Sequence, residues 1–144
     1  MSIIDKLVYD RTAQDVAQLT EKGHYNTTDL NRVGDAMGYI AGRFQAAGYS
    51  VSVTSRTDWA VGETPRQADM DTYLGDLAAL RAVLAVLAAT PQAPESMAGL
   101  TWQEANDIEK ILADVDRLLT SVAAVYLRAG MPWAQAGVTI YAKN

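Results

Sequence analysis

The chain has no cysteine and a single histidine, His24. Disulfides, thiolate zinc sites and cysteine nucleophiles are therefore excluded, and one histidine removes most histidine-based metal and triad chemistry. We interpret His24, which lies between Gly23 and Tyr25, as a partly exposed residue of a loop between helices. This shortage of reactive groups predicts a protein that is not an enzyme and has no cofactor or transition metal.

Basic clusters and long apolar runs are also missing. The 17 Asp and Glu outnumber the 12 Lys and Arg, for a net charge of -5, whereas binding to nucleic acid requires clustered basic side chains. The longest apolar run, Ala82–Ala89, falls far short of the roughly 20 residues of a membrane span. Asp5 stands where a secretory signal would continue its apolar core. We therefore expect a soluble protein made in the cytoplasm, with neither nucleic acid nor membrane as a partner.

Three segments carry apolar residues at alternating steps of three and four, the period of one helix face packed against a partner. These stripes are Leu30, Val33, Met37, Ile40, Phe44 and Ala47; Met70, Tyr73, Leu77, Leu80, Leu84 and Leu87; and Ile108, Ile111, Val115, Leu118, Val122, Val125 and Ala129. A shorter helix is expected at 13–22, with Val16 and Leu19 facing inward. The pattern predicts a mainly α protein, an antiparallel helical bundle of about four helices that forms a single domain over residues 1–144.

Start and stop residues agree with these stripes. The pairs Thr101–Glu104 and Thr64–Gln67 match the capping box, and Thr28 with Asp29 is expected to cap the helix that follows. Glycines after the periodic residues predict left-handed helix ends: Gly23, Gly48 and Gly130.

Two stretches, 49–54 and 137–141, alternate with period two and are rich in β-branched residues, as strands are. They either form a small two-stranded β element together, pair with a neighbouring subunit, or stay extended on the surface. Residues 131–144 contain one charged side chain, Lys143, and predict an extended docking tail that joins copies into a homo-oligomer or binds a partner; the alternative is a frayed chain end. The candidate interaction residues are Val51, Val53, Trp59, Trp133, Val138, Ile140 and Tyr141.

Acidic residues are the remaining candidates for a site. Di-iron bundles require a Glu-x-x-His pair from each of two helices, and a chain with a single histidine cannot supply two. We interpret the acids of the last predicted helix as a solvated, mixed-charge face: Glu104, Asp107, Glu109, Asp114 and Asp116. Asp69 and Asp71 suit the positive end of a helix dipole, and an all-oxygen cation site there is left open as an alternative.

Five stretches carry a family resemblance: 9–16, 22–33, 56–59, 69–74 and 100–109. The most distinctive part is Tyr-Asn-Thr-Thr-Asp-Leu-Asn-Arg-Val, which begins at Tyr25. Together they resemble a domain found in structural proteins of phages and prophages of Firmicutes-type bacteria, where it occurs in tail-associated or minor structural polypeptides. The resemblance implies a non-enzymatic virion or tail protein that works by self-association and by docking to other tail or baseplate proteins. The alternative is a small cytoplasmic helical module that binds a peptide or ligand in a groove or has a regulatory role.

Overall fold

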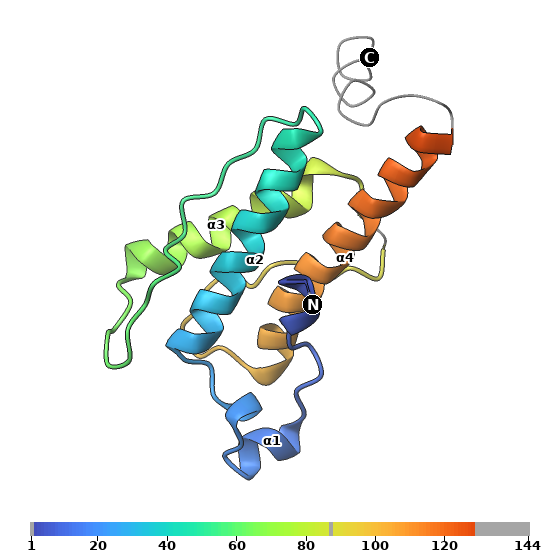
Figure 1. The fold of residues 1–144 in the computed structure, drawn as a ribbon. Coiled ribbons are helices and arrows are strands. Elements are labelled where there is room, and N and C mark those ends of the chain that lie inside the picture. The colour runs from blue at the N-terminus through green and yellow to red at the C-terminus, as the bar shows by residue number, and fades with distance from the viewer. Residues whose placement is uncertain (1, 87, 129–144) are drawn as a thin grey trace.

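The computed structural model of the chain describes residues 2–86 and 88–128. Its helices are η1 (Ile4–Lys6), α1 (Ala13–Ala17), η2 (Glu21–Gly23), α2 (Thr27–Ala46), α3 (Gln67–Val83) and α4 (Trp102–Arg128), where η marks a 3-10 helix. The three long helices pack against one another, and α1 with η2 lies below them (Figure 1). This part of the chain contains no strand. The prediction of a mainly α bundle is confirmed. Within the same residues, no helix is both long enough and apolar enough to cross a membrane.

The three long helices begin at the same end of the bundle, instead of alternating in direction. Asn26 before α2, Gln67 at the start of α3 and Leu100 before α4 all line one groove, and Figure 1 shows the chain returning to that end before each helix. Short connections produce antiparallel neighbours, but the connections 47–66 and 84–101 are long enough to run back along the bundle. The long helices are therefore not antiparallel as predicted. They start at the same end and are joined by long return segments.

The core follows the predicted stripes closely in α2 and α3 and less closely in α4. All six residues of the first stripe, five in α2 and Ala47 directly after it, are buried, as are Tyr73, Leu77 and Leu80 of α3. In α4 the stripe is buried through Val115, but Leu118 is half-buried and Val125 is 57% exposed. Because a strict 3-4 alternation drifts around a helix of 3.6 residues per turn, the α4 core also uses two leucines outside the predicted stripe. These are Leu112 and Leu119, both fully buried.

Two of the predicted helix starts are shifted. The capping box at Thr101 is confirmed, since Thr101 N donates to Glu104 Oε1 at 3.0 Å and Glu104 N donates to Thr101 Oγ1 at 3.1 Å. Helix α2 is capped by Asn26, whose side chain accepts from Thr28 N. Helix α3 starts three residues after Thr64, because Arg66 N donates to the carboxylate of Asp69 at 3.0 Å. A hydrogen bond to a charged carboxylate is stronger than one to a neutral group such as the hydroxyl of Thr64.

The glycines have different roles from one another. Gly48 has φ 96° and ends α2 as predicted: Tyr49 N donates to Phe44 O at 2.9 Å, and the two rings meet edge to face. Gly23 lies inside η2, where a Cβ would fall 2.4 Å from Asp15 O, so it is needed for close approach and not for a left-handed turn. Gly130 lies outside the described residues.

The first helix is shorter than predicted and its apolar residues face outward. It ends at Ala17, and Val16 is 41% and Leu19 71% exposed. The chain turns at Leu19, with φ 55°, so that Thr20 N can donate to Asp15 O at 3.0 Å. The prediction of an inward Val16 and Leu19 is wrong, because α1 packs on η2 through backbone contact at Gly23.

Segment 49–54 has no strand partner within the described residues. Side chains bind part of its backbone instead: Gln45 Nε2 donates to Val51 O at 2.7 Å, and Asp76 Oδ2 accepts from Thr54 N at 2.9 Å. The other strand-like stretch, 137–141, lies outside the described residues. Helix α3 ends at Val83, earlier than its stripe predicts, because Leu84 adopts an extended backbone.

The leucines of α4 give a test of which face is buried. We expect Leu112→Ala to lower the free energy of unfolding by about 2–5 kcal/mol, because it leaves a cavity in the core. Leu118→Ala should cost clearly less, since Leu118 is only half-buried. Urea denaturation of the two variants measures both values. An equal cost for the two would show that α4 is rotated relative to this packing.

Candidate functional site

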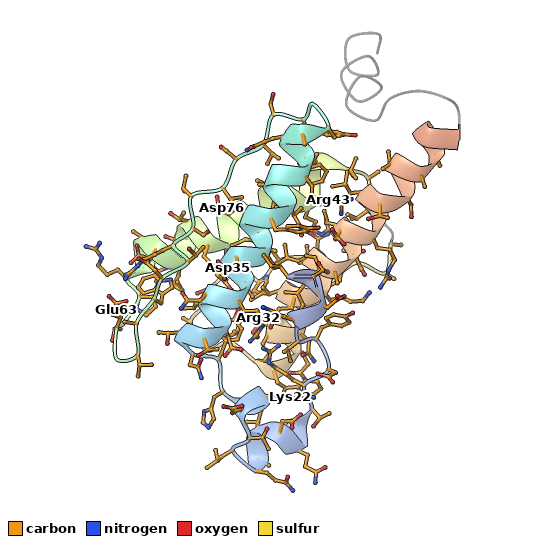
Figure 2. The ribbon with its side chains drawn as sticks, viewed as in Figure 1. Lys22, Arg32, Asp35, Arg43, Glu63 and Asp76 are labelled. Carbon is orange, nitrogen blue, oxygen red and sulfur yellow. The ribbon has the colours of Figure 1, made fainter. Side chains whose placement is uncertain are left out.

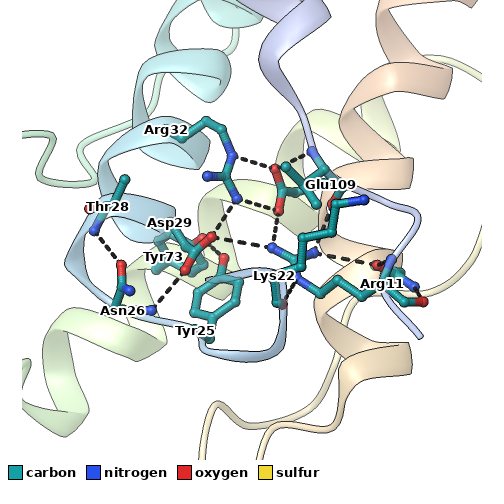
Figure 3. A network of polar contacts seen from close by, with 11 residues as sticks. Arg11, Lys22, Tyr25, Asn26, Thr28, Asp29, Arg32, Tyr73 and Glu109 are labelled. Carbon is teal, nitrogen blue, oxygen red and sulfur yellow. Dashed lines mark hydrogen bonds and ion pairs between the residues drawn. The ribbon is translucent and has the colours of Figure 1, made fainter. Parts of the chain in front are cut away.

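Glu109 of α4 is the centre of a buried polar network, drawn in Figure 3. Its side chain is 0% exposed. Val8 N donates to Oε1 at 2.8 Å, and the guanidinium of Arg11 donates to Oε2 at 2.7 Å. Arg32 of α2 holds both oxygens, with Nε and Nη2 each at 2.8 Å. A buried carboxylate is tolerated only when it is paired and hydrogen-bonded in this way.

Arg11 joins the N-terminal segment to this centre. The residue is 3% exposed. Its guanidinium donates to Val8 O at 2.7 Å and to Lys22 O at 3.0 Å, besides Glu109. Asn106 of α4 holds the Arg11 backbone on both sides, accepting from Arg11 N and donating to Arg11 O, each at 3.0 Å. The segment before α1 is thus fastened along α4.

Asp29 balances the second positive charge. Its Oδ1 accepts from Arg32 at 2.5 Å and from Arg11 at 3.3 Å, while Oδ2 accepts from Asn26 N at 2.8 Å. Burial by itself would lower the pKa of Arg32, but the hydrogen bonds and charges of Glu109 and Asp29 outweigh it and raise that pKa. Two guanidinium groups and two carboxylates therefore form a neutral, internally paired set.

Two tyrosine hydroxyls extend the network. Tyr25 and Tyr73 are hydrogen-bonded to each other through their hydroxyl oxygens, and Arg11 lies over the Tyr25 ring, 5.6 Å from its centroid. Burial, and then the charge of Glu109, raises the pKa of Tyr25; burial, and then Tyr25 itself, raises the pKa of Tyr73. Both hydroxyls stay protonated wherever the protein is folded at ordinary pH.

The arrangement holds structure together and leaves no group of this network unpaired. In the described part of the chain, every buried side-chain nitrogen and oxygen has a hydrogen-bond partner. The same residues contain no group of three or more His, Asp or Glu side chains that could hold a metal. Asp69 and Asp71, the candidates for an oxygen site, accept hydrogen bonds from Arg66 N and from Gln67.

The interpretation of Glu109 as surface charge is wrong. Glu109 lies three residues before Leu112 and four after Ala105, both buried, so helical spacing places it on the inner face. The periodic series through Ile108 and Ile111 did not include that neighbouring row. Two other acids of α4 lie nearer the surface and are also partnered: Asp114 accepts from Thr90 and Lys110, and Asp116 from Arg43.

An open groove of about 770 Å³ lies beside the network, where the three long helices begin. Tyr25 belongs to both, so one wall of the groove is anchored by the buried charges. Met70, Met97 and Leu100 contribute apolar side chains to its lining. Val61 lies at the tip of the neighbouring turn and is 94% exposed. In Figure 2, Glu63 marks this end of the molecule, and Arg43 lies near the opposite end of α2.

The loop that forms the outer wall of the groove is tightly held. Arg56 pairs with Asp58 at 2.6 Å and with Glu63 at 2.8 Å, and its guanidinium lies 4.3 Å from the centroid of the Trp59 ring. Asn31 accepts from Trp59 N at 2.7 Å and donates to Trp59 O at 2.8 Å. The N–H of Ala60, and then Arg56, lowers the pKa of Glu63. The wall is formed before anything binds.

Three of the seven candidate interaction residues lie in the described part of the chain, and the other four do not. Val51 and Val53 are half-buried against the core, and Trp59 is only 8% exposed. Trp59 therefore anchors the loop to α2 and offers little surface to a partner. The remaining candidates lie outside the described residues: Trp133, Val138, Ile140 and Tyr141. Sequence reasoning missed the network itself, although its charged residues fall in three of the segments that carry the family resemblance, 9–16, 22–33 and 100–109.

The chain matches no protein-family model, no curated protein and no solved structure.

We expect Glu109→Gln to destabilise the fold by about 3–5 kcal/mol, because it leaves the buried guanidinium group of Arg11 and the half-buried one of Arg32 with half of their counter-charge. Glu95→Gln is the matched control at an exposed position and should change the free energy of unfolding by no more than about 0.5 kcal/mol. Urea denaturation measures both variants. A Glu109→Gln protein as stable as the control would refute a central role for this carboxylate.

The tyrosine pair predicts a loss of stability at alkaline pH. Unfolded tyrosines lose their protons near pH 10, while the raised pKa values of Tyr25 and Tyr73 keep them protonated in the fold. The unfolded state then binds fewer protons than the native state, so stability falls as pH rises above about 10. The double variant Tyr25→Phe with Tyr73→Phe should show a smaller fall between pH 8 and 11, and Tyr9→Phe, at an exposed position, an unchanged one. If wild type, the double variant and Tyr9→Phe lose the same free energy of unfolding over this pH range, the tyrosine pair is not the cause of the loss.

Proposed function

We propose that the chain is a non-enzymatic structural protein of a phage or prophage tail, which acts by self-association and by docking to other tail or baseplate proteins. The observation that carries the proposal is the internal pairing of Glu109, Asp29, Arg11 and Arg32. Polar groups that converge in an enzyme are kept available for a substrate. Here they are used to fasten the N-terminal segment to the bundle, as suits a rigid building block.

The family resemblance supports the same function. The stretches that resemble the phage domain also supply the network and the anchored loop, through Arg11, Asp29, Glu109 and Trp59. On this proposal the protein is made in the cytoplasm and then enters the virion or tail-like particle.

Docking is assigned to the residues that follow α4. Residues 131–144 hold Trp133, Val138, Ile140 and Tyr141 with one charged side chain, Lys143. Uncharged, aromatic and β-branched segments of this kind join chains by adding an extended strand or by filling an apolar groove.

A second candidate is a small helical module that binds a peptide or ligand or has a regulatory role. The groove of about 770 Å³ favours it, since ligand sites have volumes of about this size. The two functions differ in what purified protein contains: a bound small molecule with a monomeric mass supports the module, and self-association without a ligand supports the structural protein.

We expect the full chain to self-associate and deletion of residues 131–144 to reduce its mass to that of a monomer. Light scattering over a range of concentrations measures the mass, and far-UV circular dichroism checks that the helices remain. If the full chain is a monomer at high concentration, or the shortened chain keeps the oligomeric mass, self-association through this segment is refuted.

A further inference from the structure

The groove and the end of α4 lie at opposite ends of the molecule. Leu100, two residues before α4, lines the groove. Helix α4 then continues for 27 residues, which corresponds to about 40 Å at 1.5 Å per residue. Figure 1 shows the last described turn of α4 far from the starts of α2 and α3. Whatever follows Arg128 therefore begins at the end of the bundle that is remote from the groove.

The groove is preformed and presents an apolar rim. Its outer wall is held by Arg56 and by the two hydrogen bonds between Asn31 and Trp59. Glu63 N donates to Ala60 O at 3.0 Å and closes the turn that carries Val61. Val61 is 94% exposed on this fixed turn, so its apolar side chain is not buried by the fold of its own chain. A preformed surface of this kind binds an extended segment without the cost of ordering itself.

The chemistry of the groove matches that of residues 131–144. Met70 and Met97 give an apolar lining that adapts to aromatic and branched side chains. The lining includes one charged side chain, Glu63, and residues 131–144 also include one, Lys143, of opposite sign. Since Glu63 already pairs with Arg56, the two surfaces match in carrying almost no charge.

The extended segment 51–59 is less suited to receive a strand. Asp76 Oδ2 accepts from the backbone N–H of both Thr54 and Ser55, at 2.9 and 2.8 Å. The N–H and C=O of Trp59 are both bound by Asn31. A strand is added through free backbone groups, and these groups are already occupied by side chains. The structure therefore favours the groove over this segment as the receiving surface.

Trp133 and Val138 cannot reach the groove of their own chain. Val138 is ten residues beyond Arg128, so a fully extended backbone carries it about 34 Å at most. This is less than the length of α4, about 40 Å. Trp133 falls shorter still. A second copy has no such restriction, because its α4 can approach the groove from outside.

We infer that residues 131–144 of one copy dock in the groove of a second copy, with Val61 and Ala98 at the contact. This inference rests on the proposed function and names its receiving site. Because the donor segment and the groove are different surfaces at opposite ends, each copy both gives and receives. Where two copies exchange segments reciprocally such head-to-tail contacts close a two-fold dimer, and otherwise they build rings or open chains.

Three full-length variants test the inference. Ala98→Trp fills the groove from an exposed alanine in its lining, and Ala79→Trp makes the same change at an exposed alanine of α3 outside it. Trp133→Ala combined with Ile140→Asp disables the donor segment and leaves the groove intact. Val61→Asp is a second groove variant, at a side chain whose removal leaves no cavity. Circular dichroism checks that each one folds.

Light scattering should show that wild type and Ala79→Trp form oligomers, while Ala98→Trp and the donor variant are each monomeric. Val61→Asp should weaken association at least tenfold. Mixing Ala98→Trp with the donor variant should restore association and stop at two chains, because the first lacks a groove and the second lacks a donor. This heterodimer is specific to head-to-tail docking.

Other outcomes overturn the inference in distinguishable ways. If wild type associates and the donor variant does not, while Ala98→Trp and Val61→Asp behave as wild type, the segment docks elsewhere; the inference fails and the proposed function stands. If wild type stays a monomer at high concentration, both the inference and self-association fail. If mixing the two defective variants gives only monomers, head-to-tail docking is excluded.

Discussion

The fold depends on compensating the charge of one buried carboxylate. Glu109 is removed from water in the middle of α4, and two guanidinium groups and a backbone N–H replace its hydration. Losing water around a charge costs several kcal/mol, which is recovered only if every partner is in place. The network thus accepts one arrangement of the N-terminal segment, α2 and α4, and a shifted packing would leave a charge unpaired.

This requirement also determines what the site can do. Arg11 reaches the carbonyl of Lys22, so the turn that precedes α2 is fixed together with the N-terminal segment. Asp29 belongs to the network and to the start of α2 at once. The neighbouring Tyr25 is thereby held in place as one wall of the groove. Buried charges that look like a reactive centre act here as the rigid support of a surface next to them.

The common starting end of the long helices explains why the groove exists. Each return segment brings a loop to that end, and the loop through Trp59 and Val61 is fastened there by Asn31 and Arg56. An up-and-down bundle with short turns would have no such loop to form the wall. The same topology separates the groove from the end of α4 by the length of that helix, and this separation makes head-to-tail assembly of copies the proposed use of the molecule.

The sequence by itself determined the long helices, the stripe of α2 and the capping box at Thr101, because apolar period and capping are properties of neighbouring residues. It did not reveal that Glu109 and Trp59 are buried or that the long helices share a starting end. Those features were decided by the tertiary structure, since Glu109 meets Arg11 and Arg32 from 98 and 77 residues away. A charge is read as a surface residue until its partners are known, because only a complete set of partners makes burial affordable in free energy.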